Sequence, residues 1–389
     1  MELNQSNANW NYPTNIRYGI GRINELGAAC IELGIRAPLL VTDPGLAQLP
    51  MVEQATVHCQ QAGLRCGLFS QIKANPTAEN VSDGVAVYQQ GEHDGVIAFG
   101  GGSALDAAKA IALMVGQVRP LWDFEDVADN WTRVNIDTMA PLVAVPTTSG
   151  TGSEVGRAAV ITDSQRQLKR LIFHPKMLPA LVILDPELTI GLPPNLTAAT
   201  GMDAFSHALE AYCAVNFHPM AEGIALEAMR LLKDYLPRAY ADGQDLAARA
   251  QVMVASTMGA TAFQRGLGSM HALAHSLGAL YDSHHGLLNA ILMPYVLQAN
   301  RSAIETRIER LSRYLELSDP SFDGFMAWVI ALRRALAIPS TLAEIGIGAD
   351  QVVKISEMAV ADPCASDNPI SFSAEQYQAL FLAAINGDQ

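Results

Sequence analysis

The chain has 389 residues, of which half are apolar and 16% are charged, so it can form a large core and is long enough for two domains. Its formal net charge is −14, with no block of Lys and Arg to offset it. This charge argues against nucleic acid and anionic membranes as partners. The five scattered cysteines form no CxxC pair and are typical of free thiols in a reducing compartment.

The N-terminal segment MELNQSNANWNYP is polar and lacks the charged-then-apolar plan of a signal peptide. No apolar run approaches the ~20 residues of a membrane span. We therefore expect a cytoplasmic protein.

Short apolar segments alternate with amphipathic helices in the first half of the chain. These segments are NIRYGIG near the start, then residues 37–43, 65–70, 94–100, 140–146 and 180–186. Nearly continuous apolar strands separated by helices predict a parallel sheet that is buried on both faces. The sequence thus predicts a Rossmann-like α/β domain over residues 1–190.

From residue 191 to residue 389 the pattern is helical, and we expect an all-α domain. Apolar residues recur at three- and four-residue spacing over 195–214, 221–235, 244–263, 270–281, 286–299, 303–316, 322–336 and 373–386.

The strand expected at 94–100 runs into GGGSALDAAKA (100–110). This loop is a plausible pyrophosphate site, with Ser103 at the expected N-cap of a helix. It is not the full dinucleotide fingerprint, because Leu105 stands where a third glycine is needed. Two other strands end in Asp43 and in PTTSGTGSE (146–154). A strand-end carboxylate accepts ribose hydroxyls and repels a 2′-phosphate, so Asp43 favours NAD over NADP.

Histidines are concentrated in HALAHSLGALYDSHH (271–285). His271 and His275 are four residues apart, as are Asp203 and His207 in GMDAFSHALEAY, so each pair shares a helix face. Imidazoles with one carboxylate are typical ligands of a divalent transition metal. The two pairs together with His285 predict a metal site.

These motifs, in this order and spacing, resemble the iron-containing (group III) alcohol dehydrogenases over essentially the whole chain. The resemblance implies a dehydroquinate synthase-like architecture and a metal held by Asp203, His207, His271 and His285, with His275 close to metal and substrate. The metal is usually Fe²⁺ and sometimes Zn²⁺. The NAD contacts that it implies are Asp43, Asn75, Gly100, Gly101, Gly102, Ser103, Asp106, Thr147 and Thr148.

The function that follows is an NAD-linked alcohol dehydrogenase or aldehyde reductase. In this hypothesis hydride passes between nicotinamide and the carbon of a metal-bound alcohol or carbonyl, and His275 relays the proton. The partners are a small alcohol or aldehyde and further copies of the chain, as a homodimer or larger. Three departures from the family pattern stand out. His284 replaces the usual Pro, which makes the last ligand ambiguous by one residue, and Ile370 replaces the usual Arg. Asp282 and Ser283 also differ from the common family choices beside the cleft.

Two alternatives stay open at this point. Dehydroquinate synthase-like lyases and glycerol dehydrogenase-like enzymes also combine an NAD domain with a metal, although a lyase acting on a phosphorylated sugar acid needs more Lys and Arg than this helical half contains. A non-catalytic metal-binding protein would not need the glycine-rich loop.

Overall fold

The computed structural model describes residues 12–387, so most of the polar N-terminal segment lies outside the described part of the chain. The chain divides into two compact units. One is Pro13–Gly191, and the other is built on Leu192–Gln389. Each unit has its own core, and we describe each by itself.

The first unit contains the expected parallel sheet. Its six strands are β1 (Asn15–Tyr18), β2 (Pro38–Val41), β3 (Gly67–Phe69), β4 (Gly95–Gly100), β5 (Leu142–Pro146) and β8 (Leu181–Leu184). They lie in the order β1-β8-β5-β4-β2-β3, and every pairing is parallel. Every residue of β2, β4, β5 and β8 is buried, which confirms the fold predicted from the continuous apolar strands.

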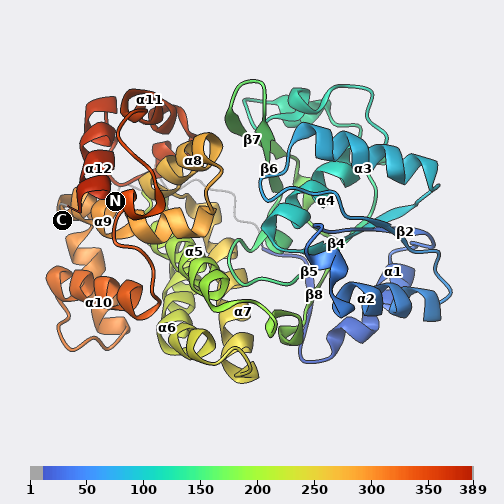
Figure 1. Ribbon diagram of the computed structural model, residues 1–389, viewed down its shortest axis with the longest axis horizontal. Helices are drawn as coiled ribbons and strands as arrows, with labels where there is room; N and C mark the ends of the chain where they lie inside the picture. The colour runs from blue at the N-terminus through green and yellow to red at the C-terminus, as the bar shows by residue number, and fades with distance from the viewer. Residues whose placement is uncertain (1–11, 388–389) are drawn as a thin grey trace. The chain divides into compact units, whose positions relative to one another are not determined.

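Helices cover both faces of this sheet (Figure 1). They are α1 (Leu26–Glu32), α2 (Pro50–Gln61), α3 (Ala78–Gln90) and α4 (Gly102–Met114). One core cluster joins α1 and α2 to alternate strand residues such as Ile97, Phe99 and Val143. Because neighbouring strand residues face opposite ways, Val96 and Ala98 belong to the other face, and α4 packs against β4 there.

A hairpin that the sequence analysis missed completes the unit. The strands β6 (Ala158–Asp163) and β7 (Leu168–Phe173) pair antiparallel. Their turn contains no glycine, and Gln167 adopts a positive φ of 55° instead. The unit also has short 3-10 helices at Arg22–Glu25, Leu46–Gln48, Leu121–Phe124, Asn130–Arg133, Ile136–Thr138, Ser153–Val155, Pro175–Met177 and Pro186–Thr189.

Helices are the only regular elements among the described residues of the second unit, as predicted. Its α-helices are α5 (Pro194–Cys213), α6 (Pro219–Ala241), α7 (Leu246–Ala262), α8 (Ser269–Tyr281), α9 (His285–Tyr314), α10 (Phe322–Ala335), α11 (Val352–Ala361) and α12 (Ala374–Asn386). Short 3-10 helices lie at Phe263–Arg265, Ala343–Ile345 and Pro363–Asp367. All eight α-helices contribute to one hydrophobic core.

Two expectations for this unit were wrong. Residues 286–299 and 303–316 were expected to form separate helices, but one 30-residue helix, α9, runs unbroken through the first range and ends at Tyr314 within the second. The polar residue Asn300 breaks the apolar pattern without breaking the helix, because its buried amide bonds to Val296 O and to Asn368. Helix α11 was not expected at all. None of the described helices is long and apolar enough to cross a membrane.

Candidate metal centre and dinucleotide site

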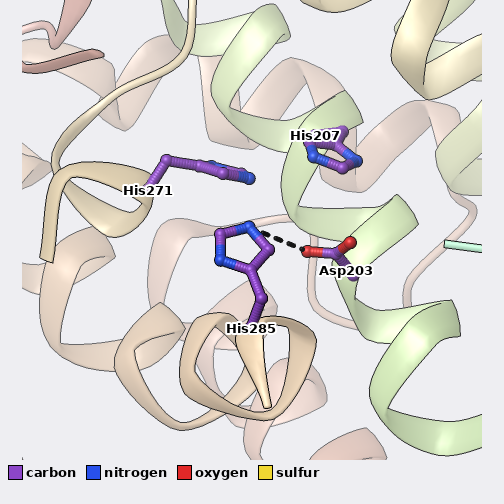
Figure 2. Close-up of side chains that lie close together, drawn as sticks. All are labelled: Asp203, His207, His271 and His285. Atoms are coloured by element: carbon purple, nitrogen blue, oxygen red, sulfur yellow. Dashed lines mark ion pairs between the residues drawn. The ribbon is translucent and has the colours of Figure 1, made fainter. Parts of the chain in front are cut away.

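Four side chains of the helical unit point into one common space (Figure 2). They are Asp203 and His207 on α5, His271 on α8 and His285 at the first residue of α9. One ligand atom from each lies within 4.8 Å of all the others. The structure therefore brings together the residues that the spacing of the two motifs suggested.

Burial and close helix packing fix this arrangement. Asp203, His207 and His271 are each at most 5% exposed. The rings of His207 and His271 stack at 4.7 Å, and His285 Nε2 lies 3.6 Å from Asp203 Oδ1. A Cβ on Gly286 would come within 2.4 Å of Ala199 O, so this glycine lets α9 approach α5. Position 286 thus sets how near His285 comes to Asp203.

The adjacent residue His284 has a different place. It is exposed and precedes α9, and its Nδ1 accepts a hydrogen bond from Leu287 N at 3.4 Å. The structure therefore assigns His284 to the helix N-cap and His285 to the cluster.

The amide of Asn289 shows that the donor set suits a cation. Its Nδ2 lies 2.9 Å from Asp203 Oδ1, 3.1 Å from His271 Nε2 and 3.2 Å from His285 Nε2. This amide is completely buried and has two N–H hydrogens for three acceptor atoms. An ion is not limited to two acceptors. The residues present therefore fit a divalent metal with nitrogen and oxygen ligands.

Two carboxylates that the sequence analysis missed bond to the histidines of α8. Glu210 Oε2 lies 2.6 Å from His271 Nδ1, and Asp362 Oδ2 lies 2.9 Å from His275 Nδ1. A carboxylate accepts only, so each imidazole donates from Nδ1 and presents Nε2 on its other side. Glu210 had a signal in the sequence, because it follows His207 by three residues on the same helix. Asp362 had none.

The charges around these pairs shift two pKa values. Burial lowers the pKa of His271, but the Glu210 carboxylate, together with Asp203 and Asp362, outweighs it, so the net shift is upward when no ion is present. A proton therefore competes with a cation for Nε2. Burial raises the pKa of Asp362, but the nearby His275 and the Cys364 N–H outweigh it, so the net shift is downward. Asp362 is thus an ionised acceptor for His275.

His275 lies beside the cluster without joining it. Its ring stacks on His285 at 5.2 Å and meets His271 edge-on at 6.0 Å. It forms a separate group with Asp362 and Cys364.

The α/β unit gathers its polar and glycine-rich residues at the carboxyl ends of β2, β4 and β5. Gly100 pairs with Pro146 across β4 and β5, and Thr147 N donates to Gly100 O at 2.9 Å. A Cβ on Gly102 would meet Thr151 Cγ2 at 2.5 Å. The two loops are therefore so close that residue 102 has no room for a side chain.

Ser103 and Asp43 lie at this same edge. The expectation that Ser103 is the N-cap of α4 was wrong, because Gly101 takes that position and the Ser103 hydroxyl bonds to Ala74 O, next to Asn75. Asp43 follows β2, and its Oδ1 accepts from Leu46 N at 2.9 Å.

The Asp106 carboxylate bonds to residues of its own unit. It accepts from Ser153 Oγ at 2.5 Å and Val160 N at 2.9 Å, and it pairs with buried Lys109 at 3.1 Å. These bonds tie α4 to the loop after β5 and to β6.

Comparison with known proteins accounts for both halves of the chain. Residues 13–186 match the family model for iron-containing alcohol dehydrogenase, and residues 197–385 match that for the Fe-containing alcohol dehydrogenase family, C-terminal. A 4-hydroxybutyrate dehydrogenase of Cupriavidus necator is 40% identical, covering 94% of this chain and 97% of its own. An NAD-dependent methanol dehydrogenase of Bacillus methanolicus is 36% identical, with 90% and 93% covered.

A solved structure agrees with these sequence matches. The crystal structure of a 1,3-propanediol oxidoreductase superimposes with a TM-score of 0.92 at 33% identity, over 97% of this chain and all of the other. The two family models together span most of the sequence, and the relatives match over nearly their full length. The chain therefore belongs to the iron-containing alcohol dehydrogenase family and is an oxidoreductase that acts on alcohols.

Proposed function

We propose that Asp203, His207, His271 and His285 together hold one divalent ion. The observation that carries this proposal is the convergence of their ligand atoms within 4.8 Å in a largely buried space. Three neutral imidazoles and one carboxylate leave an ion with a net charge near +1, which suits an oxygen anion. An ion held there supplies a Lewis acid for the oxygen of an alcohol or a carbonyl group.

Fe²⁺ is the ion we assign to this centre, with Zn²⁺ as the alternative. The family description supports iron. Zinc binds nitrogen-rich sites more tightly than ferrous iron. Zinc in a purified sample would therefore reflect which metal was available as much as which metal the site selects.

NAD is the cofactor that we assign to the edge formed by β2, β4 and β5. The N-terminus of α4 and the glycines 100–102 suit the pyrophosphate, with Ser103, Asn75, Thr147 and Thr148 around them. The Asp43 carboxylate would accept from the adenosine ribose and repel a 2′-phosphate. Asp106 contributes by holding the Ser153 loop against α4. The NAD-dependence printed for the methanol dehydrogenase relative agrees with this preference.

His275 is the residue that we expect to move the proton. Its Nδ1–H is held by Asp362, so Nε2 is the atom that can take a proton from an alcohol or return one to a carbonyl oxygen. Its side chain is 12% exposed, whereas His271 is sealed at 1%. His275 is therefore the more accessible of the two imidazoles.

A small primary alcohol and its aldehyde form the substrate pair that we propose. The relatives named for methanol, 1,3-propanediol and 4-hydroxybutyrate share a terminal CH₂OH group. We also propose a homodimer or larger assembly, on the family resemblance. The five free cysteines support a reducing compartment, the cytoplasm. Size-exclusion chromatography with light scattering tests the assembly.

The test of the function is oxidation of NADH, with NADPH in parallel, by iron- or zinc-loaded protein against short aldehydes and matched ketones. We expect turnover that prefers aldehydes and NADH and that stops when a chelator removes the metal. Turnover that persists in metal-free protein would contradict the proposed role of the ion. Equal rates with NADPH would contradict the proposed role of Asp43.

A further inference from the structure

The first turn of α8 has no cap from its own sequence. Its N-cap residue is Gly268, which has no side chain, so the first N–H groups of this buried helix need partners from elsewhere. Two distant side chains supply them. Glu210 on α5 serves Gly268 and Met270, and Asn368 serves Ser269.

Glu210 does more than cap this helix. Its Oε1 accepts from Met270 N at 2.7 Å, and its Oε2 accepts both from Gly268 N at 2.8 Å and from His271 Nδ1 at 2.6 Å. The side chain is 7% exposed, so these three donors replace the water that it loses. The positive end of the helix also favours its charge.

The backbone of Gly268 shows how tightly this carboxylate is held. A Cβ there would lie 2.8 Å from Glu210 Oε1 and 2.7 Å from Asn368 Oδ1. Both distances are too short for a real side chain. Two N–H groups at the start of the helix and the imidazole together hold both oxygens of the carboxylate.

We infer that Glu210 is a positioning residue of the metal centre, which fixes the tautomer and the direction of His271 so that Nε2 faces the ion. The inference rests on the metal site proposed above. A carboxylate behind a metal-binding imidazole raises its basicity, and removing such a partner typically costs about 10- to 100-fold in metal affinity.

Asn368 provides a control, because it caps the same helix without touching His271. Its Oδ1 accepts from Ser269 N at 3.0 Å. Were Glu210 only a helix cap, loss of either residue would lower stability and leave the intrinsic metal affinity alone. A role in the centre predicts that only the Glu210 variant loses affinity.

The experiment compares wild-type protein, Glu210→Gln and Asn368→Ala. Gln keeps the length and an acceptor oxygen of Glu210 but loses the charge, so this variant tests the charge with little change in packing. Affinity for Zn²⁺ and Co²⁺ is measured by competition with a chromophoric chelator on metal-free protein, and thermal unfolding of the metal-free protein is measured alongside. In the Co²⁺ proteins, the exchangeable imidazole N–H proton reports on the bond from His271.

We expect E210Q to lose 10- to 100-fold in affinity and to exchange this N–H proton faster, while N368A stays within about threefold of wild type despite a lower Tm. E210Q within threefold of wild type, or an equal loss in N368A, would overturn the inference. Should E210Q not fold, Glu210→Asp is measured by the same criteria. Loss of folding in both Glu210 variants would make the residue a structural cap and also overturn it. Wild-type protein that binds no metal would instead defeat the proposed function.

Discussion

The two units form their proposed sites by different means. The α/β unit relies on missing side chains, because Gly100 adopts a φ of +146° and Gly102 lies against Thr151. The helical unit relies on side chains that converge from three helices. Adding a side-chain group should therefore damage the first site, and removing a side chain should damage the second. We expect each substitution to change binding only in the unit that carries it.

The largest effect that we expect comes from removing a ligand. His271→Ala should lower metal affinity by more than about 100-fold, beyond the range for outer partners, and abolish turnover. Binding of NADH, followed by fluorescence, should stay within about twofold. Metal content per chain is the first measurement.

His284→Ala is the matched control, since His284 lies next to the cluster in sequence but caps α9. It should keep its metal. An H271A protein that retains metal and turnover would refute the assignment of the site.

His275→Ala separates proton transfer from metal binding within the helical unit. We expect kcat to fall by about 100-fold or more, because a positioned acid–base group contributes roughly 10²- to 10⁴-fold. Metal content should be unchanged, because His275 is not one of the four residues whose ligand atoms converge. Metal loss equal to that of H271A would instead make His275 a ligand.

Gly102→Ala tests the α/β unit by adding a single methyl group. That group would press on Thr151, so we expect NADH binding to weaken about tenfold, which is ~1.4 kcal/mol, while metal content stays at the wild-type level. Gly191→Ala is the control, because a Cβ there meets nothing within 4 Å. Unchanged NADH binding in G102A would show that the close approach of the two loops is not needed.

Asp43→Asn should produce the smallest effect. Asn keeps an oxygen for Leu46 N and loses the charge, so the turn survives and the repulsion of a 2′-phosphate disappears. We expect the ratio of kcat/KM for NADH over NADPH to fall by roughly five- to tenfold, since one exposed charge pair is worth ~1 kcal/mol. A constant ratio would remove Asp43 from cofactor choice.

How much the sequence could predict depends on how far apart in the chain the interacting residues lie. Periodicity revealed the parallel sheet and most of the helices, because each depends on residues close in the chain. It failed at Asn300, whose buried amide is satisfied by a residue 68 positions away, and at the hairpin turn, where Gln167 takes a conformation usual for glycine.

The candidate site divides in the same way. The i,i+4 pairs on α5 and α8 could be read directly from their spacing. Asp362 could not, because its partner His275 lies 87 residues earlier in the chain. Asn289 follows His285 by four residues on α9, but its bond to Asp203 needs the approach of α9 to α5, which Gly286 allows. Partners of this kind become visible only in three dimensions.

The cap of α8 has a consequence for the folding of the chain during its synthesis on the ribosome. The helix begins at residue 269, yet one of its first N–H groups bonds to residue 368, 99 positions later. A nascent chain shorter than this has all four cluster residues but an incomplete helix start. We therefore expect the full stability of this helix only near the end of synthesis, so chains truncated before Asn368 should unfold at a lower temperature than the full chain.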